Sequence, residues 1–298
     1  ESCYNKYFKK LEATDEIGSD HYYYRYRFQA AHWGQRFFQS SLPHDLEPHA
    51  LILDFDINYF LNKLKLACQF MTLANVGNRD HDLAWVQQTL RESSRFAEVP
   101  LVALYRANLQ TQLEEDNHRH FETIKSLLKK HENDISKEEL TGFYVMATNY
   151  CTRKLHRNEL HYFDELAHLY KAIVKNELLF EEGFIMPTRF KNIVMVGAKS
   201  QDFEWVEQFM EDYGKHLVPK FRESTLQYCQ ATIHFHRGDY EKVKTSLLET
   251  GTIDVYFSLG ARHLLLKTYY ELTESDAFFN LMDTFKSFLR TNKQLSSP

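Results

Sequence analysis

The feature of this sequence that most constrains the fold is a recurrence of residues 76–86 at residues 196–206. Val-Gly at 76–77 followed by Asp-Leu-Ala-Trp-Val at 82–86 matches Val-Gly at 196–197 followed by Asp-Phe-Glu-Trp-Val at 202–206, with identical spacing. Self-similarity at a fixed period is the sequence signature of a repeat architecture, in which each repeat buries its apolar face against its neighbours. We therefore expect a stacked array of similar elements.

The composition favours helices as those elements. The 298 residues include only 10 Gly and 6 Pro, while 43% are hydrophobic and 23 Phe and 18 Tyr are available for a large core. The net charge of −5, from intermixed charges of both signs, gives no electrostatic footprint for nucleic acid. No apolar run reaches the roughly 18 residues of a membrane-spanning helix, so we expect no membrane partner.

Four cysteines, Cys3, Cys68, Cys151 and Cys229, are scattered singly and form no CxxC pair. We expect reduced thiols packed in helices, and a cytoplasmic protein. Cys151 and Cys229 lie in apolar helical contexts without a sign of activation as nucleophiles. The first residues, Glu-Ser-Cys-Tyr, show neither an initiator Met nor a signal-peptide pattern, so we expect a start truncated from a longer protein.

Apolar residues at three- and four-residue intervals predict about 13 helices, paired as hairpins. Helices are expected over 57–76, capped by Asp56 or Asn58, and over 83–96, and others begin at Pro100, Pro187 and Pro219. Ser136 and Glu139 form a capping box, in which the Glu139 side chain reaches back to the start of the helix. The best strand candidate is the short apolar run 51–55.

Superposing the predicted helix pairs extends the recurrence. Asp82, Asp202 and Asp239 each open the second helix of a pair. The position of Leu83 recurs at Phe121, near Leu160, and at Phe203 and Tyr240, at intervals of about 37 to 43 residues, which suits helical-hairpin repeats. Trp85 and Trp205 precede valines in this register, so we expect them to fill gaps between adjacent hairpins rather than to bind a ligand.

Residues 231–243, Ala-Thr-Ile-His-Phe-His-Arg-Gly-Asp-Tyr-Glu-Lys-Val, resemble a tetratricopeptide repeat in their small residue and Gly-Asp-Tyr turn. The resemblance implies an all-α fold, a right-handed α-α superhelix of about five or six hairpins over residues 50–292. It also implies that partner proteins or peptides bind on the concave face. Residues 1–49 would form an aromatic-rich helix that caps this solenoid, and residues 293–298 a C-terminal tail.

In such solenoids the first helix of each pair lines the concave face. Its polar residues here are the candidate binding residues: Asn149, Arg153, Arg189, Lys191, Asn192 and Gln227. Arg and Asn side chains can hold a peptide backbone or carboxylate. The carboxylate clamp of chaperone-binding members is not reproduced, because Met195 and Thr232 stand where that pattern has Asn. Each candidate can also be simply solvent-exposed.

Two further patterns in the sequence bear on other binding chemistries. In the aromatic stretch 20–33, Arg25 and Arg27 could accompany base stacking, but packing is the preferred interpretation. His161, Asp164 or Glu165, and His168 share a helical face with the Glu-x-x-His spacing of di-iron bundles, a spacing repeated at Glu115 and His118. Such a site needs glutamates on two further helices, and no clear candidates occur. We therefore expect no metal and no cofactor.

The absence of GxSxG, P-loop and GxGxxG motifs argues against an enzyme. The function expected is a non-catalytic scaffold that binds a protein or peptide along the concave face of the solenoid. Two alternatives stay open. One is a ligand- or peptide-sensing regulatory domain of a longer protein truncated upstream. The other is a metal-dependent helical enzyme built around His161, Glu165 and His168.

Overall fold

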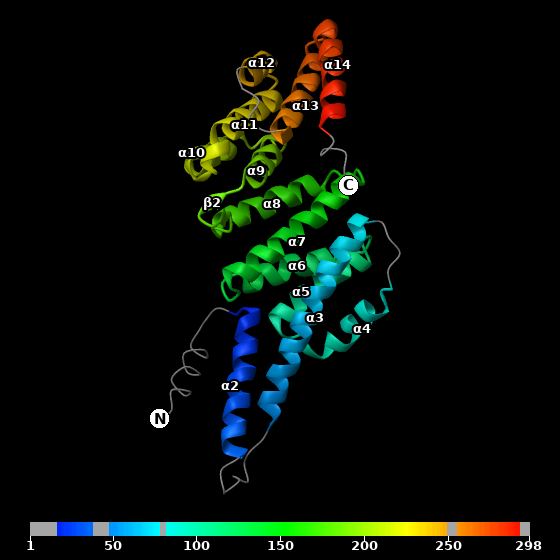
Figure 1. Ribbon diagram of the computed structural model, residues 1–298, viewed down its shortest axis with the longest axis vertical. Helices are drawn as coiled ribbons and strands as arrows, with labels where there is room; N and C mark the ends of the chain where they lie inside the picture. Colours follow the sequence, from blue (N-terminus) through cyan, green and yellow to red (C-terminus); the bar gives the residue numbers. More distant parts are fainter. Residues whose placement is uncertain (1–16, 38–47, 78–81, 249–254, 293–298) are drawn as a thin grey trace. The chain divides into compact units, whose positions relative to one another are not determined.

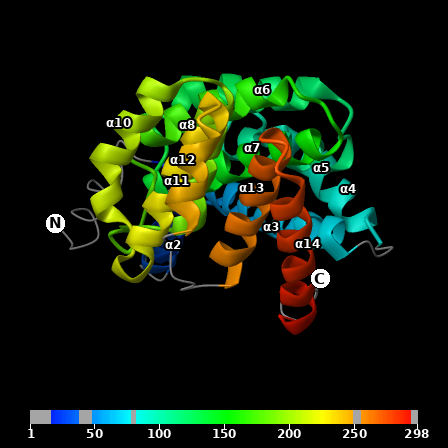
Figure 2. The ribbon, with the colours of Figure 1, turned by 90° about the horizontal axis from the view of Figure 1, so that it is seen from above.

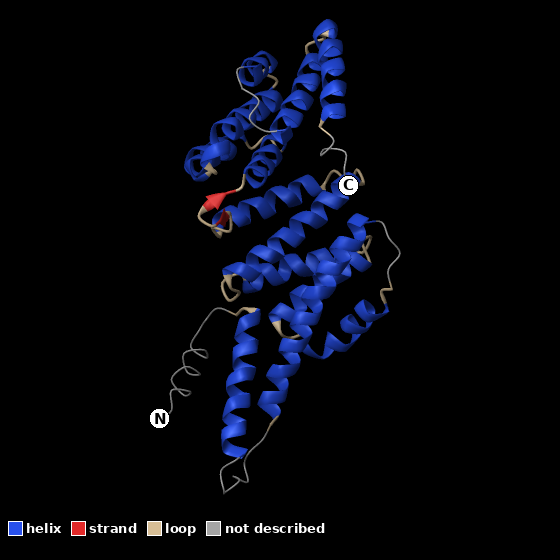
Figure 3. Cartoon of the chain, viewed as in Figure 1, coloured by secondary structure: helices blue, strands red, loops and turns tan. Residues whose placement is uncertain are grey.

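The chain is described by a computed structural model over residues 17–37, 48–77, 82–248 and 255–292 (Figure 1). Thirteen α-helices lie within these described residues, and neighbouring helices pack in pairs, which confirms the predicted all-α class. Figure 3 shows how little of the chain is strand. Contacts divide the chain into two compact units, residues 1–156 and 157–298, which are considered one at a time. The predicted C-terminal tail, residues 293–298, lies outside the described residues.

The first unit is built around α3, which packs against α2 on one side and α5 on another. Its described elements are α2 (Ser19–Phe37), α3 (His49–Gly77), α4 (Ala84–Glu92), η1 (Ser93–Phe96), α5 (Pro100–Leu113), α6 (His118–His131) and α7 (Lys137–His156). The core between α3 and α5 consists of side chains with no exposed surface, including Leu61, Leu64, Leu101 and Leu104. Burial of these side chains is the main term that holds the unit together.

Helix α3 begins two turns earlier than the sequence predicted. Residues 51–55, the predicted strand candidate, are helical, so the strand is wrong and the predicted caps lie inside the helix. The reason is a tertiary contact: Asp54, only 2% exposed, accepts hydrogen bonds from Arg25 Nε (3.1 Å) and Gln29 Nε2 (2.6 Å) of α2. Periodicity cannot assign so short an apolar run to a strand or a helix. The same contact gives Arg25 a packing role.

The second unit also consists of packed helices. Its described elements are α8 (Tyr162–Lys175), β1 (Phe180–Glu181), β2 (Phe184–Ile185), α9 (Pro187–Lys199), α10 (Phe203–Tyr213), η2 (Gly214–His216), η3 (Pro219–Phe221), α11 (Arg222–Arg237), α12 (Tyr240–Leu248), α13 (Val255–Glu271) and α14 (Ser275–Thr291). Figure 2 shows α13 beside α14, and the two helices pack together. Pro100 and Pro187 open α5 and α9 as predicted, whereas Pro219 opens the short η3 ahead of α11.

The two strands form an antiparallel hairpin that the sequence did not predict. Its turn residues, Glu182 and Gly183, both have positive φ (50° and 83°), as a two-residue type I′ turn requires. Two residues per strand are too few to give an alternating pattern.

Three hairpins of the second unit turn in the same way. At Gln201, Gly238 and Thr273 the backbone is left-handed (φ 59°, 82° and 59°). In each case that residue donates its N–H to the carbonyl three residues back, and the next N–H bonds the carbonyl five residues back at 2.9–3.0 Å. These are the hydrogen bonds of a Schellman motif. The next helix, α10, α12 or α14, begins two residues after the left-handed residue.

The predicted register is not kept in all five places. Phe203 and Tyr240 open their helices, and Leu83 directly precedes α4. Phe121, however, is the fourth residue of α6, because Asn117 caps that helix and accepts a hydrogen bond from the backbone of Arg119. Leu160 lies two residues before α8 and is 59% exposed.

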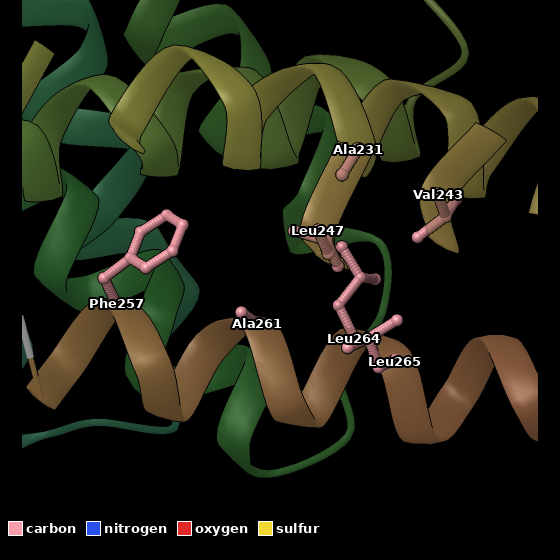
Figure 4. Packing of buried hydrophobic residues seen from close by; sticks show 7 residues of the cluster. All are labelled: Ala231, Val243, Leu247, Phe257, Ala261, Leu264 and Leu265. Atoms are coloured by element: carbon pink, nitrogen blue, oxygen red, sulfur yellow. The ribbon is translucent and has the colours of Figure 1, made fainter. Parts of the chain in front are cut away.

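Neighbouring hairpins bury a common core in the second unit. Figure 4 shows α13 facing the α11–α12 hairpin through seven buried side chains: Ala231, Val243, Leu247, Phe257, Ala261, Leu264 and Leu265. The small Ala231 and Ala261 allow the helices to approach closely, and the leucines fill the space beside them. This packing fixes α11 and α13, two of the helices that carry the surface described below.

Candidate binding surface

The recurring Val-Gly and Trp-Val residues build helix packing. Gly197 of α9 lies against α10 so closely that a Cβ atom there would overlap Val206 Cγ2 and lie 3.1 Å from the Trp205 ring. Trp85 packs edge-on against Phe70 of α3, with ring centroids 5.4 Å apart. A packing role for both tryptophans is therefore confirmed. Each contacts the first helix of its own pair, and the Trp205 ring centroid also lies 5.4 Å from Lys171 Nζ of the preceding helix α8. The side chains of residues 76–81 are not described.

Several candidate binding residues make intramolecular bonds. Arg153 donates to Glu115 Oε1 at 3.1 Å. Arg189 donates to the carbonyls of Leu178 and Leu179 and pairs with Glu181 at 2.9 Å, so it ties the hairpin to α9. The Lys191 ammonium lies 5.6 Å from the ring centroid of Tyr228 on α11.

The other three candidate binding residues are Asn149, Asn192 and Gln227. Asn149 and Asn192 are exposed on α7 and α9. Gln227 lines an open hollow of about 420 Å³ between α10 and α11. Asn149 and Arg153 belong to the first unit and the rest to the second, and within the second unit their side chains contact different neighbours. Within the second unit, Arg189, Lys191, Asn192 and Gln227 therefore do not form one site.

Helix α9 presents one continuous exposed face. Its residues follow at helical intervals of four, three and four: Thr188, Asn192, Met195 and Lys199. Asn192 is the predicted residue that belongs to this face. Lys199, at its end, is the last residue of α9, and its ammonium lies 3.6 Å from the ring centroid of Phe163.

Lys199 belongs to a group that we name the basic cluster: Lys199 of α9, His236 of α11, and His263 and Lys267 of α13. Helix α11 packs against both α9 and α13, which brings these side chains within electrostatic reach of one another. His263 and Lys267 are one turn apart on α13. Lys199, His263 and Lys267 are exposed, and His236 is half-buried.

The positively charged groups within the basic cluster repel one another. Burial lowers the pKa of Lys199, and the Lys267 charge lowers it further. Burial and then the charges of Lys199 and Lys267 lower the pKa of His236, and burial and Lys267 lower that of His263. Every neighbouring charge that acts on these three groups is positive. Among the described residues, no carboxylate forms an ion pair with any member of the cluster.

Helix dipoles stabilise part of the positive charge of the basic cluster. Lys199 and His236 lie in the last turns of α9 and α11, where the partial negative charge of the carbonyl ends stabilises a cation by about 0.3–1 kcal/mol. His263 and Lys267 lie before the last turn of α13 and gain little from its dipole. The cluster therefore carries positive charge that the fold itself does not neutralise.

A second polar group, in the first unit, joins α2, α3, α5 and α7. Glu139 accepts hydrogen bonds from Ser19 Oγ (2.6 Å), Lys65 Nζ (2.5 Å) and Tyr105 Oη (2.5 Å). Burial raises the pKa of Glu139, but these bonds outweigh it and the net pKa is lowered. The capping box is therefore only half formed. Glu139 N–H lies 3.5 Å from Ser136 Oγ, while the Glu139 side chain turns to α2, α3 and α5.

This group lines a hollow of about 630 Å³ and contains a serine 2.6 Å from a lysine, the contact used by Ser–Lys nucleophiles. Such chemistry needs a neutral amine to accept the serine proton. Lys65 Nζ donates a hydrogen bond to Glu139 at 2.5 Å, and the Ser19 hydroxyl donates to the same carboxylate rather than to the amine. The geometry is that of an interhelical tie, since every strong donor is already directed at one carboxylate.

The other chemistry-bearing residues do not converge. In the described part of the chain, no three His, Cys, Asp or Glu side chains are grouped to hold a metal ion. Cys68, Cys151 and Cys229 are buried thiols, as predicted, and burial raises the pKa of Cys68 to about 12. Cys3 lies outside the described residues. No described helix is both long and apolar enough to traverse a bilayer.

Neither family models, nor curated proteins, nor solved structures offer a match to this chain.

Proposed function

We propose that this chain is a non-catalytic protein-binding scaffold, and that its second unit binds an acidic segment of a partner protein at the basic cluster. One observation carries the proposal: Lys199, His236, His263 and Lys267 gather on three neighbouring helices without a carboxylate partner among the described residues. An anionic segment would neutralise charges that repel one another in the unbound chain.

The surroundings of the cluster favour a peptide over a nucleic acid. Apolar side chains flank the charges, with Met195 42% exposed one turn before Lys199 and Tyr270 74% exposed one turn after Lys267. Two of the four basic groups are histidines, and the whole chain is acidic, whereas nucleic-acid binding relies on an extended Lys and Arg surface. A segment that alternates acidic and apolar residues fits both features.

The proposal also keeps the tetratricopeptide-like interpretation. Helices α9, α11 and α13 are the first helices of three successive hairpins, the position that lines the concave face in the family that the sequence resembles. The right-handed superhelix, with a peptide along its concave face, is part of this proposal.

The test is binding of a short fluorescent peptide that alternates glutamate with leucine, measured by anisotropy. We expect Lys199→Glu with Lys267→Glu to weaken binding by about tenfold or more, because each reversal replaces attraction by repulsion. Higher ionic strength should weaken binding to the wild-type chain. The same peptide with glutamine in place of glutamate should bind poorly.

Lys215→Glu with Lys220→Glu is the matched control, since it changes the net charge equally at exposed positions of the same unit. It should leave the affinity within about twofold, because exposed charges away from the site are screened. Equal losses in the two double variants would mean that net charge alone governs binding, and the site assignment would be rejected.

A further inference from the structure

The open hollow of about 420 Å³ between α10 and α11 contains no residue of the basic cluster. Six side chains line it: Glu207, Met210 and Glu211 of α10, and Leu226, Gln227 and Gln230 of α11. We name it the α10–α11 hollow. The end of α10 lies close against α11 here, since a Cβ atom at Gly214 would be only 3.0 Å from Leu226 Cδ2. The two walls of the hollow are therefore fixed against each other.

The two helices run in opposite directions along the hollow. Toward one end, Arg237 of α11 donates to both carboxylate oxygens of Glu207, at 2.7 and 2.9 Å, in a bidentate pair. Glu211 follows Glu207 by one helical turn and so lies on the same side of α10. Earlier on α11, the residues that reach the hollow are Gln230 and Gln227. The chain thus pairs Glu207 with an arginine but places amides, not a second arginine, in the hollow with Glu211.

The polar side chains of the hollow present acceptors. Glu211 is exposed and forms no ion pair or hydrogen bond with any other described residue. Gln230 Nε2 lies 3.3 Å from His234 Nε2. Because an amide nitrogen only donates, the imidazole nitrogen accepts this bond, and the Gln230 carbonyl oxygen can accept from a ligand. A carboxylate beside amide oxygens selects a positively charged donor.

The apolar side chains of the hollow narrow the choice of donor. Met210 and Leu226 are half-buried and offer a surface for the alkyl stem of a long side chain whose charged head stays in water. The planar head of arginine carries five donors, which can bond a carboxylate and an amide oxygen together, whereas lysine is a strongly hydrated point charge. An acidic side chain would be repelled by Glu211. The lining therefore fits arginine best.

We propose that the α10–α11 hollow binds an arginine side chain of a partner protein, with the guanidinium on Glu211 and the alkyl stem along Met210 and Leu226. The same kind of contact already occurs within the chain one turn away, between Arg237 and Glu207. The inference does not rest on the basic cluster, which shares no residue with the hollow.

The experiment compares two short fluorescent peptides by anisotropy. One alternates arginine with leucine, and the other has citrulline, an uncharged side chain of similar shape, in place of arginine. The wild type should bind the arginine peptide more tightly. Glu211→Gln should weaken binding of the arginine peptide by about fivefold, the upper range for an exposed ion pair, and leave the citrulline peptide within about twofold.

A second variant tests the site by a gain of affinity. Gln227→Glu adds a carboxylate to the hollow at a side chain that makes no hydrogen bond with other described residues. It should strengthen binding of the arginine peptide by about threefold to fivefold. A misfolded chain cannot produce this result.

Asp276→Asn is the matched control, because it removes the same charge at an exposed position of α14. It should change the affinity by less than about twofold. Lys199→Glu with Lys267→Glu should not weaken binding of the arginine peptide, so the hollow and the basic cluster are tested separately. Equal losses in Glu211→Gln and Asp276→Asn, or a wild type that does not prefer arginine to citrulline, would overturn the proposal.

Discussion

At the scale of single residues, the recurrence of Val-Gly and Trp-Val reports a steric requirement. Gly197 has no side chain because Val206 and Trp205 occupy the space where a Cβ atom would be. Gly142 of α7 is also helical, but nothing lies within 4 Å of its virtual Cβ. Close packing therefore requires glycine at position 197 but not at position 142.

Gly197→Ala should destabilise the chain by about 1–2 kcal/mol, because overpacking outweighs the roughly 1 kcal/mol that alanine gains in helix propensity. Gly142→Ala should stabilise it by about 0.5–1 kcal/mol, since only the propensity term acts there. Urea unfolding of both variants measures the two signs. Stabilisation by Gly197→Ala would show that α10 packs less closely on α9 than described.

At the scale of elements, the second unit makes its helical turns with main-chain hydrogen bonds. The left-handed residues of these three turns are Gln201, Gly238 and Thr273. Only Gly238 is a residue type that adopts this conformation without strain. Thr273, which is β-branched, bears a strain of about 1–2 kcal/mol.

Thr273→Gly should therefore stabilise the chain by about 0.5–1 kcal/mol, after allowance for the extra entropy of glycine in the unfolded state. Thr284→Gly, at an exposed position inside α14, is the control and should destabilise by about 0.5–1 kcal/mol. Thermal unfolding should separate the two variants. Loss of stability in Thr273→Gly would mean that the threonine side chain supports the turn.

The sequence was informative where local rules decide the structure. Proline at the start of α5 and α9 and the Gly-Asp turn before α12 were predicted because they depend only on nearby backbone. The early start of α3 was missed because it depends on Asp54 meeting α2. The basic cluster was missed because its residues are separated in sequence by 27 to 68 positions or share a helix, and no local pattern connects them.

At the scale of the whole molecule, histidines with lowered pKa values in both units make stability depend on pH. Burial lowers the pKa of His21 in the first unit and of His234, His236 and His263 in the second. Their folded pKa values lie below the unfolded value of about 6.5, so the unfolded chain binds protons first as pH falls. Folding stability should therefore be full above pH 6.5 and decline below it.

Urea midpoints measured from pH 7.5 to 5.5 should decrease, and His236→Gln should make the decrease smaller. His156→Gln, at an exposed position, is the control for loss of a histidine. Adding the acidic peptide should oppose the decrease, because a bound anion favours the protonated imidazoles of the basic cluster. A midpoint that does not change with pH would contradict this account of the four histidines.

The shared turn geometry of α9–α10, α11–α12 and α13–α14 has a consequence for how these hairpins tolerate change in sequence. The same hydrogen bonds are made with glutamine, glycine and threonine at the left-handed position. These turns are specified by peptide groups, which every residue carries. Such hairpins can lose nearly all recognisable resemblance in sequence while they keep their shape. Substitution at these positions is therefore limited by the strain of the left-handed backbone and not by the loss of a side-chain contact.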